Sequence, residues 1–389
     1  MEFIKAYDCD SHVEEWEGTF SDAYLEPAFR DRRPIVVETG EFEHDYVWLI
    51  DGNRIRLGGS PSSKNGVPST EYSKMARWRG PLQSGEFRSA ADRLAVMDAE
   101  DAWLSVNYPT LLLRPSVAKD PALNQALVRA YNNWIADISS EAPERLKWVT
   151  VIDVRDPKAA AAEMIRTAEM GSVGVMVLGV YGDKLLDDPD FTPIWETAND
   201  LGMPVNVHLG SGGGGAARNP ASVSHNVFIN VVRGFETICS SGLLDRYPNV
   251  RVSFLETTCT WVDFAVKEMN FTLDNIRERI KLGTLRAEHR PIVERGLPKM
   301  TPLEYMQAGR IFINFEIDDE LLPYMVNRYG IDCWMYAADL PHAHRKTNAV
   351  RSVLDRPDLP DEAKKRILWE GTSRLYGFQL PSGSAAALS

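Results

Sequence analysis

Eight short apolar segments recur along the chain, and stretches with helical periodicity separate most of them. Several segments, including GVMVLGV and PVNVHL, are almost continuously apolar, which is typical of parallel strands buried on both faces. The pattern predicts strands at residues 3–9, 103–108, 147–152, 174–179, 204–209, 251–256, 311–316 and 333–338.

The segments between these strands carry helix signals. Asp120-Pro121 is a favourable helix start for residues 120–142, and Gly171 is a typical stop for a helix over 156–170. Strand–helix alternation implies a parallel α/β sheet, and a count of eight favours a closed (β/α)8 TIM barrel. An open doubly wound sheet is disfavoured because no GxGxxG motif follows the first strand. Further helices are expected at 192–201, 226–246, 260–280, 319–329 and 361–376.

One segment breaks this alternation. Residues 36–60 alternate apolar and polar positions, and Asp51-Gly52 separates two runs, as in a β-hairpin. The following stretch is rich in Ser, Gly, Pro and Arg. We therefore expect a hairpin and loop insertion over about 36–92, within a single metal-dependent barrel domain spanning 1–380, and a disordered tail at 381–389.

Composition narrows the class of protein. The 389 residues are 44% hydrophobic and carry a formal net charge of −12, which argues against nucleic acid or anionic membrane as a partner. No apolar run approaches the roughly 20 residues of a membrane span, and the N-terminus lacks a signal-peptide pattern. The four cysteines form no CxxC pair. The cysteine pattern predicts reduced, buried thiols in a cytoplasmic protein.

Carboxylate and imidazole side chains lie at the ends of four predicted strands. Asp10-Ser11-His12 follows FIKAYDC, His208 follows MPVNV, Glu256 ends RVSFLE, and Asp339 and His342 lie in AADLPHAH. Such side chains bind divalent metals, and the carboxyl ends of barrel strands meet at one mouth. The sequence therefore predicts a metal centre there. Its candidate ligands are Asp10, His12, His208, Asp339, Glu256 and His342, with Glu15 and His344 as additional candidates.

Structural interpretations compete with this one. His208 on an apolar strand is also typical of a hydrogen-bonded core histidine, and Glu256 could pair with an arginine. A structural explanation is weakest around Asp339, because His342 and His344 lie so close together. The candidate catalytic groups are Asp339, Glu256 and His342, with Asp339 transferring the proton. Asn107, Asp153 and Glu316 are further candidates to line the mouth.

Several strings together resemble a known family. DCDSH, RLAVMDAEDAWLSVNYPT, AYNNWIAD, PVNVHLGSG, GLLDRYPNVRVSFLE and AADLPH look like the amidohydrolase superfamily, in its amidohydrolase-related branch. This branch includes aminocarboxymuconate-semialdehyde decarboxylase and the aromatic acid decarboxylases. The likeness covers nearly the whole chain. It implies a (β/α)8 barrel whose divalent metal is held by Asp10, His12, His208 and Asp339, and it implies a homo- or hetero-oligomer, since branch members commonly form dimers.

The chain departs from the family pattern at two positions. Asp10 replaces the first histidine of the usual His-x-His, and Glu256 replaces the histidine of the sixth strand. Both changes exchange nitrogen for oxygen, which favours manganese or iron over zinc.

Three mechanisms and one non-enzymatic role fit these residues. A metal-dependent hydrolase would activate water, and a non-oxidative decarboxylase (carboxy-lyase) would act on a small organic, or aromatic, acid. The surplus of ligands also fits a dinuclear non-haem iron oxygenase, because one ion needs only three or four protein ligands. The fourth role is a catalytically silent subunit of a hetero-oligomer. Metal content separates these classes.

Overall fold

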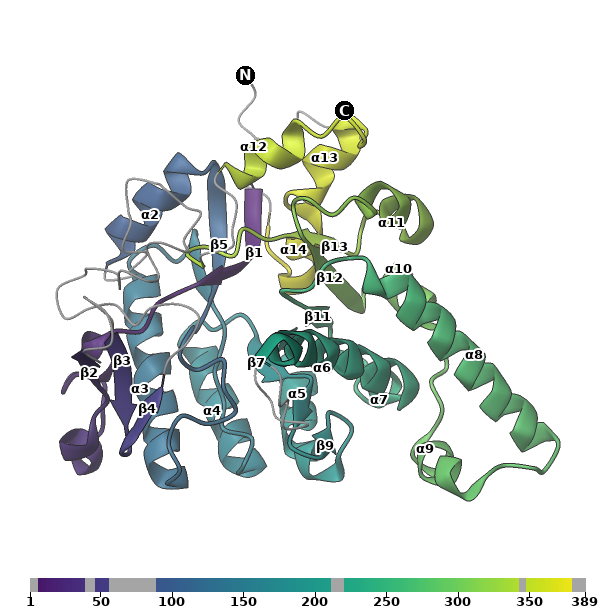
Figure 1. Ribbon diagram of the computed structural model, residues 1–389, viewed down its shortest axis with the longest axis horizontal. Coiled ribbons are helices and arrows are strands. Elements are labelled where there is room, and N and C mark those ends of the chain that lie inside the picture. Colours follow the sequence, from purple (N-terminus) through teal and green to yellow (C-terminus); the bar gives the residue numbers. More distant parts are fainter. Residues whose placement is uncertain (1–5, 39–45, 56–88, 211–219, 343–347, 380–389) are drawn as a thin grey trace.

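The computed structural model of the protein describes residues 6–38, 46–55, 89–210, 220–342 and 348–379 (Figure 1). Within them, eight strands lie at the positions expected from the apolar pattern, and every ladder between them is parallel. These strands are β1 (Ala6–His12), β5 (Ala102–Tyr108), β6 (Leu146–Trp148), β7 (Val175–Leu178), β10 (Val205–His208), β11 (Val252–Phe254), β12 (Ile311–Phe315) and β13 (Trp334–Tyr336). The first strand ends three residues later than predicted.

The strands close into a (β/α)8 TIM barrel. Two sheets, β1-β5-β6 and β7-β10-β11-β12-β13, form most of the wall. A parallel bridge between Thr150 and Val175 joins β6 to β7. At the opposite seam, the amide of Asp339 donates to the carbonyl of Asp10 at 3.0 Å, which joins β13 to β1. The fold predicted from the strand–helix alternation is therefore confirmed.

The helices begin and end where local signals place them. Asp120 and Asp156 cap two of them by accepting from backbone amides, each with a proline in the first turn, and Gly202 ends another in the left-handed region. The principal barrel helices are α3 (Pro121–Ser140), α4 (Pro157–Glu169), α5 (Thr192–Leu201), α6 (Pro220–Ser240), α8 (Trp261–Lys281), α11 (Leu322–Tyr329) and α14 (Glu370–Tyr376).

The remaining elements are short, and several were not expected. The single helices predicted at 226–246 and 361–376 are each divided in two. Shorter helices are α7 (Leu243–Arg246), α9 (Arg290–Arg295), α10 (Pro302–Gln307), α12 (Ala349–Leu354) and α13 (Asp361–Ile367), and the 3-10 turns are η1 (Glu17–Phe20), η2 (Pro27–Arg32), η3 (Pro189–Phe191) and η4 (Ala287–His289). A small hairpin, β8 (Val180–Tyr181) and β9 (Lys184–Leu185), follows β7.

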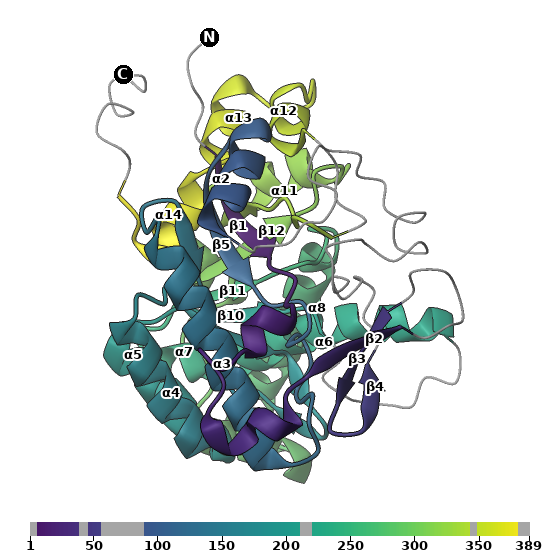
Figure 2. The same cartoon turned by 90° about the vertical axis from the view of Figure 1, so that its left-hand side faces the viewer.

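The segment after β1 forms the predicted hairpin and one further strand. β3 (Tyr46–Ile50) and β4 (Asn53–Ile55) are antiparallel, and β2 (Ile35–Glu38) pairs with the other edge of β3. Asp51 and Gly52 both have positive φ in the turn, as a two-residue hairpin requires. The small sheet lies outside the barrel in both views (Figure 1, Figure 2).

The insertion predicted over 36–92 also contains the start of an unexpected helix, α2 (Ala90–Ala99), which Ser89 caps by accepting from Asp92. Residues 56–88 of the insertion and the tail at 381–389 lie outside the described residues.

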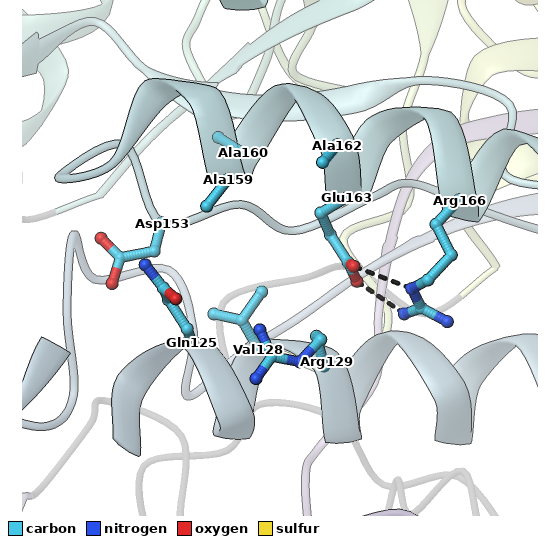
Figure 3. Close-up of a pocket in the computed structure, with 9 residues that line it drawn as sticks. All are labelled: Gln125, Val128, Arg129, Asp153, Ala159, Ala160, Ala162, Glu163 and Arg166. Carbon is cyan, nitrogen blue, oxygen red and sulfur yellow. Dashed lines mark hydrogen bonds and ion pairs between the residues drawn. The ribbon is translucent and has the colours of Figure 1, made fainter. Parts of the chain in front are cut away.

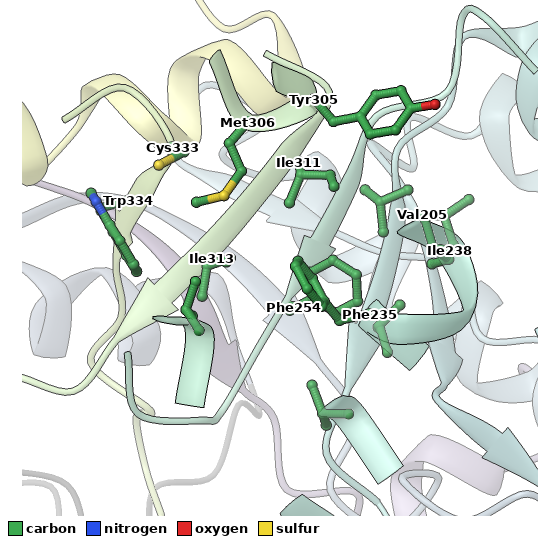
Figure 4. Close-up of a cluster of buried hydrophobic side chains, with 14 of the residues drawn as sticks. Val205, Phe235, Ile238, Phe254, Tyr305, Met306, Ile311, Ile313, Cys333 and Trp334 are labelled. Atoms are coloured by element: carbon green, nitrogen blue, oxygen red, sulfur yellow. The ribbon is translucent and has the colours of Figure 1, made fainter. Parts of the chain in front are cut away.

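Apolar side chains between the barrel wall and its helices form the core. Figure 4 shows one part, where residues of β10 to β13 pack with residues of α6 and α10. Its members include Val205, Phe235, Phe254, Ile313 and Trp334, all almost fully buried. In the described part of the chain, every helix is too short or too polar to cross a bilayer.

The close approach of α6 to the end of β7 generates a test of the packing. A Cβ atom on Gly179 would lie 1.8 Å from the backbone oxygen of Asn230, which cannot move like a side chain. We expect Gly179→Ala to lower the free energy of unfolding by about 1–3 kcal/mol, as overpacking does, measured by urea denaturation. Gly283→Ala is the control, since an added Cβ there meets no atom within 4 Å. It should cost only the strain of a left-handed backbone, about 1–2 kcal/mol, and less than Gly179→Ala. Equal losses in both variants would contradict the packing argument.

Candidate metal centre

Four candidate ligands from distant parts of the sequence converge at one end of the barrel. Strand β1 carries Asp10 and His12, β10 ends at His208, and Asp339 follows β13. Asp10 Oδ1 lies 3.4 Å from His12 Nε2 and 3.1 Å from His208 Nε2. His12 Nε2 also lies 3.6 Å from Asp339 Oδ1. All four residues are buried, so the structure brings together side chains that the sequence places up to 329 positions apart.

Backbone carbonyls orient both imidazoles. His12 Nδ1 lies 2.8 Å from the carbonyl oxygen of Pro109, and His208 Nδ1 lies 2.7 Å from that of Leu209. Because a carbonyl oxygen can only accept, each Nδ1 carries the hydrogen and each Nε2 faces the cluster. This arrangement of a donated Nδ1–H and an inward Nε2 is the one that metal-binding histidines use.

The charges of the cluster shift one another's protonation. Burial alone would raise the pKa of Asp10, but His208 and His12 outweigh it and lower that pKa. Burial, with the neighbouring His342, lowers the pKa of His12 to about 4. Burial would also lower the pKa of His208, but Asp10 and Glu256 raise it to about 9. The raised pKa of His208 and the lowered pKa of Asp10 favour a proton on His208 Nε2, and a divalent cation at that atom would compete with the proton.

The two strand-end acids share an unusual backbone. Glu256 has φ +56° and Asp339 has φ +51°, in the left-handed region that non-glycine residues seldom adopt and that clusters at functional sites. Glu256 Oε2 lies 3.6 Å from His208 Nδ1. Burial, followed by the neighbouring Asp339 carboxylate, raises the pKa of Glu256 to about 7. Glu256 is thus placed to hold a proton near neutral pH, beside the cluster.

These side chains fit a divalent metal. Asp10 Oδ2 and His12 Nε2 are buried and make no hydrogen bond to any residue that the structure describes, a state that costs free energy unless a cation compensates. Two groups have ligand atoms within 4.8 Å of one another: Asp10 with His12 and His208, and His12 with Asp339 and His342. Glu256 belongs to neither group, and it lies next to the cluster through His208.

His342, a member of the second ligand group, also contacts the loop after β5. Its Nδ1 lies 2.7 Å from Asp339 Oδ1, and its Nε2 lies 3.1 Å from Thr110 Oγ1. The three side chains form a chain of contacts from Asp339 to the loop after β5. Sequence reasoning missed Thr110. The available signal was its place two residues beyond a strand end, and the chemistry of threonine alone did not single it out.

Glu15, an additional candidate ligand, is directed to the main chain. Its carboxylate accepts from the backbone amides of Thr110, Leu111 and Leu112 at 3.1, 2.8 and 3.2 Å. These hydrogen bonds engage the Glu15 carboxylate and hold the loop of Thr110 in place. Glu15 belongs to neither ligand group. His344, the other additional candidate, lies outside the described residues.

The other strand-end residues serve different contacts. Asn107 donates to the carbonyl of Lys147 at 2.7 Å, and Asp153 pairs with Arg155 at 2.6 Å. Asp153 lines a pocket of about 230 Å³ between α3 and α4, and none of the candidate ligands lines this pocket (Figure 3). Glu316 follows β12 and is partly exposed. None of these three belongs to the ligand groups found among the described residues.

Comparison with known proteins identifies the family of this chain. Residues 98–378 match the sequence model described as Amidohydrolase. The chain belongs to the amidohydrolase family. The resemblance seen in the sequence motifs is therefore confirmed. A gamma-resorcylate decarboxylase from Polaromonas sp. (strain JS666) is 27% identical over an alignment of 184 residues, and the match covers 41% of this chain and 53% of that protein. The chain thus spans about half the length of the curated relatives it matches.

Several solved structures have the same fold as this protein. An amidohydrolase from Mycobacterium avium subsp. paratuberculosis K-10 has a TM-score of 0.74 at 17% identity, over 98% of this chain and 99% of that one. A 5-carboxyvanillate decarboxylase from Novosphingobium aromaticivorans, complexed with manganese and 4-hydroxy-3-methoxy-5-nitrobenzoic acid, has a TM-score of 0.61 at 18% identity, over 74% and 80%. At these identities the likeness concerns the barrel alone.

The ligand geometry predicts the effect of removing one imidazole. We expect His12→Ala and His208→Ala to reduce bound metal from near one ion per chain to a small fraction, because each deletes an inward Nε2. Elemental analysis of the purified proteins measures this. The control is His289→Ala, which changes a partly exposed histidine in η4. Full metal content in both His12 and His208 variants would refute the assignment.

Proposed function

We propose that this protein is a metal-dependent enzyme that removes the carboxyl group of a small aromatic acid without oxidation. The observation that carries the proposal is the buried convergence of Asp10, His12, His208 and Asp339. Curated relatives named gamma-resorcylate decarboxylase support the reaction class, although the match spans only about half of their length. Hydrolysis at the same centre is the alternative reaction that we propose, because the matching family model is described as Amidohydrolase.

The residues that would hold the metal are Asp10, His12, His208 and Asp339. A divalent ion bound there would supply positive charge for the substrate carboxylate and a neighbouring oxygen. Two carboxylates with two imidazoles make an oxygen-rich set, which favours manganese or iron over zinc. Manganese is also the ion named with three of the similar barrel structures.

The protein's own groups would then move the proton. In decarboxylation the carbon–carbon bond to the carboxyl group breaks, carbon dioxide leaves, and the ring carbon gains one proton. Asp339 lies in the cluster and contacts His342 Nδ1, so its carboxyl is placed to deliver that proton and to recover it from the imidazole. Thr110, on the other imidazole nitrogen, holds His342 in line.

The position of His12 Nε2 favours a centre with one metal ion over a centre with two. His12 is common to both ligand groups, and its Nδ1 is committed to the Pro109 carbonyl. The remaining Nε2 has one lone pair and can bind one ion only. Without His12, the second group retains two members, Asp339 and His342. We therefore favour a mononuclear centre over the dinuclear iron oxygenase.

The proposal extends to organisation and location. We treat residues 1–380 as one metal-dependent barrel domain with the insertion at about 36–92, acting on a small molecule as a homo- or hetero-oligomer. Cys9, Cys239, Cys259 and Cys333 are all free and buried, which supports a reducing compartment such as the cytoplasm.

A direct assay tests the reaction. Full-length protein loaded with manganese is incubated with hydroxylated benzoic acids labelled with ¹³C in the carboxyl group, and NMR follows the label. We expect label to appear as carbon dioxide or bicarbonate, in proportion to enzyme. Hydrolysis of esters or amides with no release of label would select the hydrolase instead, and inactivity towards both classes would favour the silent subunit.

Asp339→Asn tests the proton-transfer role. The amide cannot give or take the proton, so we expect kcat to fall by at least about 10²-fold while circular dichroism and thermal melting stay near those of the parent. Asp153→Asn is the matched control, because Asp153 is a buried carboxylate outside the cluster. Near-normal turnover of Asp339→Asn would overturn the assigned role.

Metal removal tests dependence on the ion and its number. Chelation should abolish activity, and titration with Mn²⁺ should restore it with a break at one ion per chain. Two irons per chain in protein purified without added metal would instead select the oxygenase. No bound metal, with unchanged activity after chelation, would contradict a metal-dependent reaction.

A further inference from the structure

The ligand-bearing part of β1 is irregular. Asp8 is aligned with Ser105 of β5, and Ser11 is aligned with Asn107. Three steps along β1 therefore match two steps along β5, which is a β-bulge. The bulge contains Asp10 and lies just before His12. Since one residue of slip turns a side chain to the opposite face of a strand, this bulge determines where both ligands point.

A single carboxylate spans this bulge and the barrel seam. Asp8 Oδ1 accepts from the amide of Asp10 at 3.1 Å and from the amide of Ala338 at 3.0 Å. Asp8 Oδ2 accepts from Ser11 Oγ at 2.6 Å. Asp8 is 2% exposed. The Asp8 carboxylate thus accepts hydrogen bonds from both sides of the seam. On the β13 side the donor is Ala338, one residue before Asp339, and on the β1 side the donors are Asp10 and Ser11, within the bulge.

At this seam the Asp8 carboxylate accepts hydrogen bonds that a backbone carbonyl would accept in a regular β-ladder. The β1–β13 seam lacks a regular ladder among the described strands. The neighbouring backbone bonds there run from the amide of Asp339 to the carbonyl of Asp10 and from the amide of His12 to the carbonyl of Leu340. Without the Asp8 carboxylate, two buried amides, those of Asp10 and Ala338, would lose their acceptor. An unsatisfied buried amide is unfavourable, so the bulge and the seam would rearrange to satisfy them.

We propose that Asp8 is a positioning residue that sets the spacing between the β1 ligands, Asp10 and His12, and Asp339 beyond β13. This inference rests on the proposed metal-dependent function. Asp8 belongs to neither ligand group among the described residues, and both of its oxygens accept from protein donors. Its contribution to the metal centre is therefore indirect, through the backbone.

The experiment measures Mn²⁺ affinity of the full-length, metal-stripped protein by isothermal titration calorimetry. Asp8→Ala removes all three acceptor contacts, and we expect it to weaken Mn²⁺ binding by about 10- to 100-fold, as loss of a supporting contact does. Asp8→Asn keeps an oxygen for the amides of Asp10 and Ala338, and we expect binding within about threefold of the parent. Rescue by this conservative change separates position from charge.

A control variant shows whether the loss of any buried carboxylate weakens Mn²⁺ binding. Asp153→Ala deletes another buried, hydrogen-bonded carboxylate and should leave Mn²⁺ affinity unchanged even where it lowers the melting temperature. A folded Asp8→Ala variant with parental affinity would overturn the inference. A tenfold loss in Asp8→Asn would also overturn it, because charge would then matter more than geometry, and this variant decides the question if Asp8→Ala does not fold. Absence of Mn²⁺ binding by the parent protein would instead overturn the proposed function itself.

Discussion

Like charges do not stay together in a protein interior unless something compensates them, and the mouth of this barrel gathers several. Asp10, Asp339 and Glu256 lie buried around the imidazoles of His12 and His208. The raised pKa values of His208 and Glu256 favour protons on these two groups, and such protons compensate part of the charge. A divalent cation would compensate it more completely, because it interacts with several ligands at once.

Much of the surrounding structure keeps this arrangement in place. Carbonyl groups fix the imidazole orientations, and Glu15 holds the loop that brings Thr110 to His342. Both strand-end acids have left-handed backbones, a conformation that persists only where its surroundings determine it. The barrel thus supplies a rigid frame in which the proposed ligands and proton-transfer groups are already close together before any substrate binds.

The sequence predicted the barrel well because parallel strands buried on both faces leave a strong apolar pattern, and the ends of such strands meet. That reasoning also found Asp10, His12, His208 and Asp339. It missed α2, whose start lies in a stretch rich in loop-forming residues. It missed Thr110 and offered Glu15 as a ligand, because carboxylate contacts with backbone amides depend on how two loops meet, which residue spacing does not encode.

The seam between β1 and β13 has a consequence for biosynthesis. Asp8 and Ala338 are 330 positions apart, and the backbone after α13 also returns to β1, where the amide of Tyr7 donates to the carbonyl of Leu368. The contacts of β1 with these residues can therefore form only after β13 and Leu368 have been synthesised. A nascent chain can assemble the middle of the barrel earlier, but Asp10 and His12 meet Asp339 only after the segment that follows β13 has been synthesised.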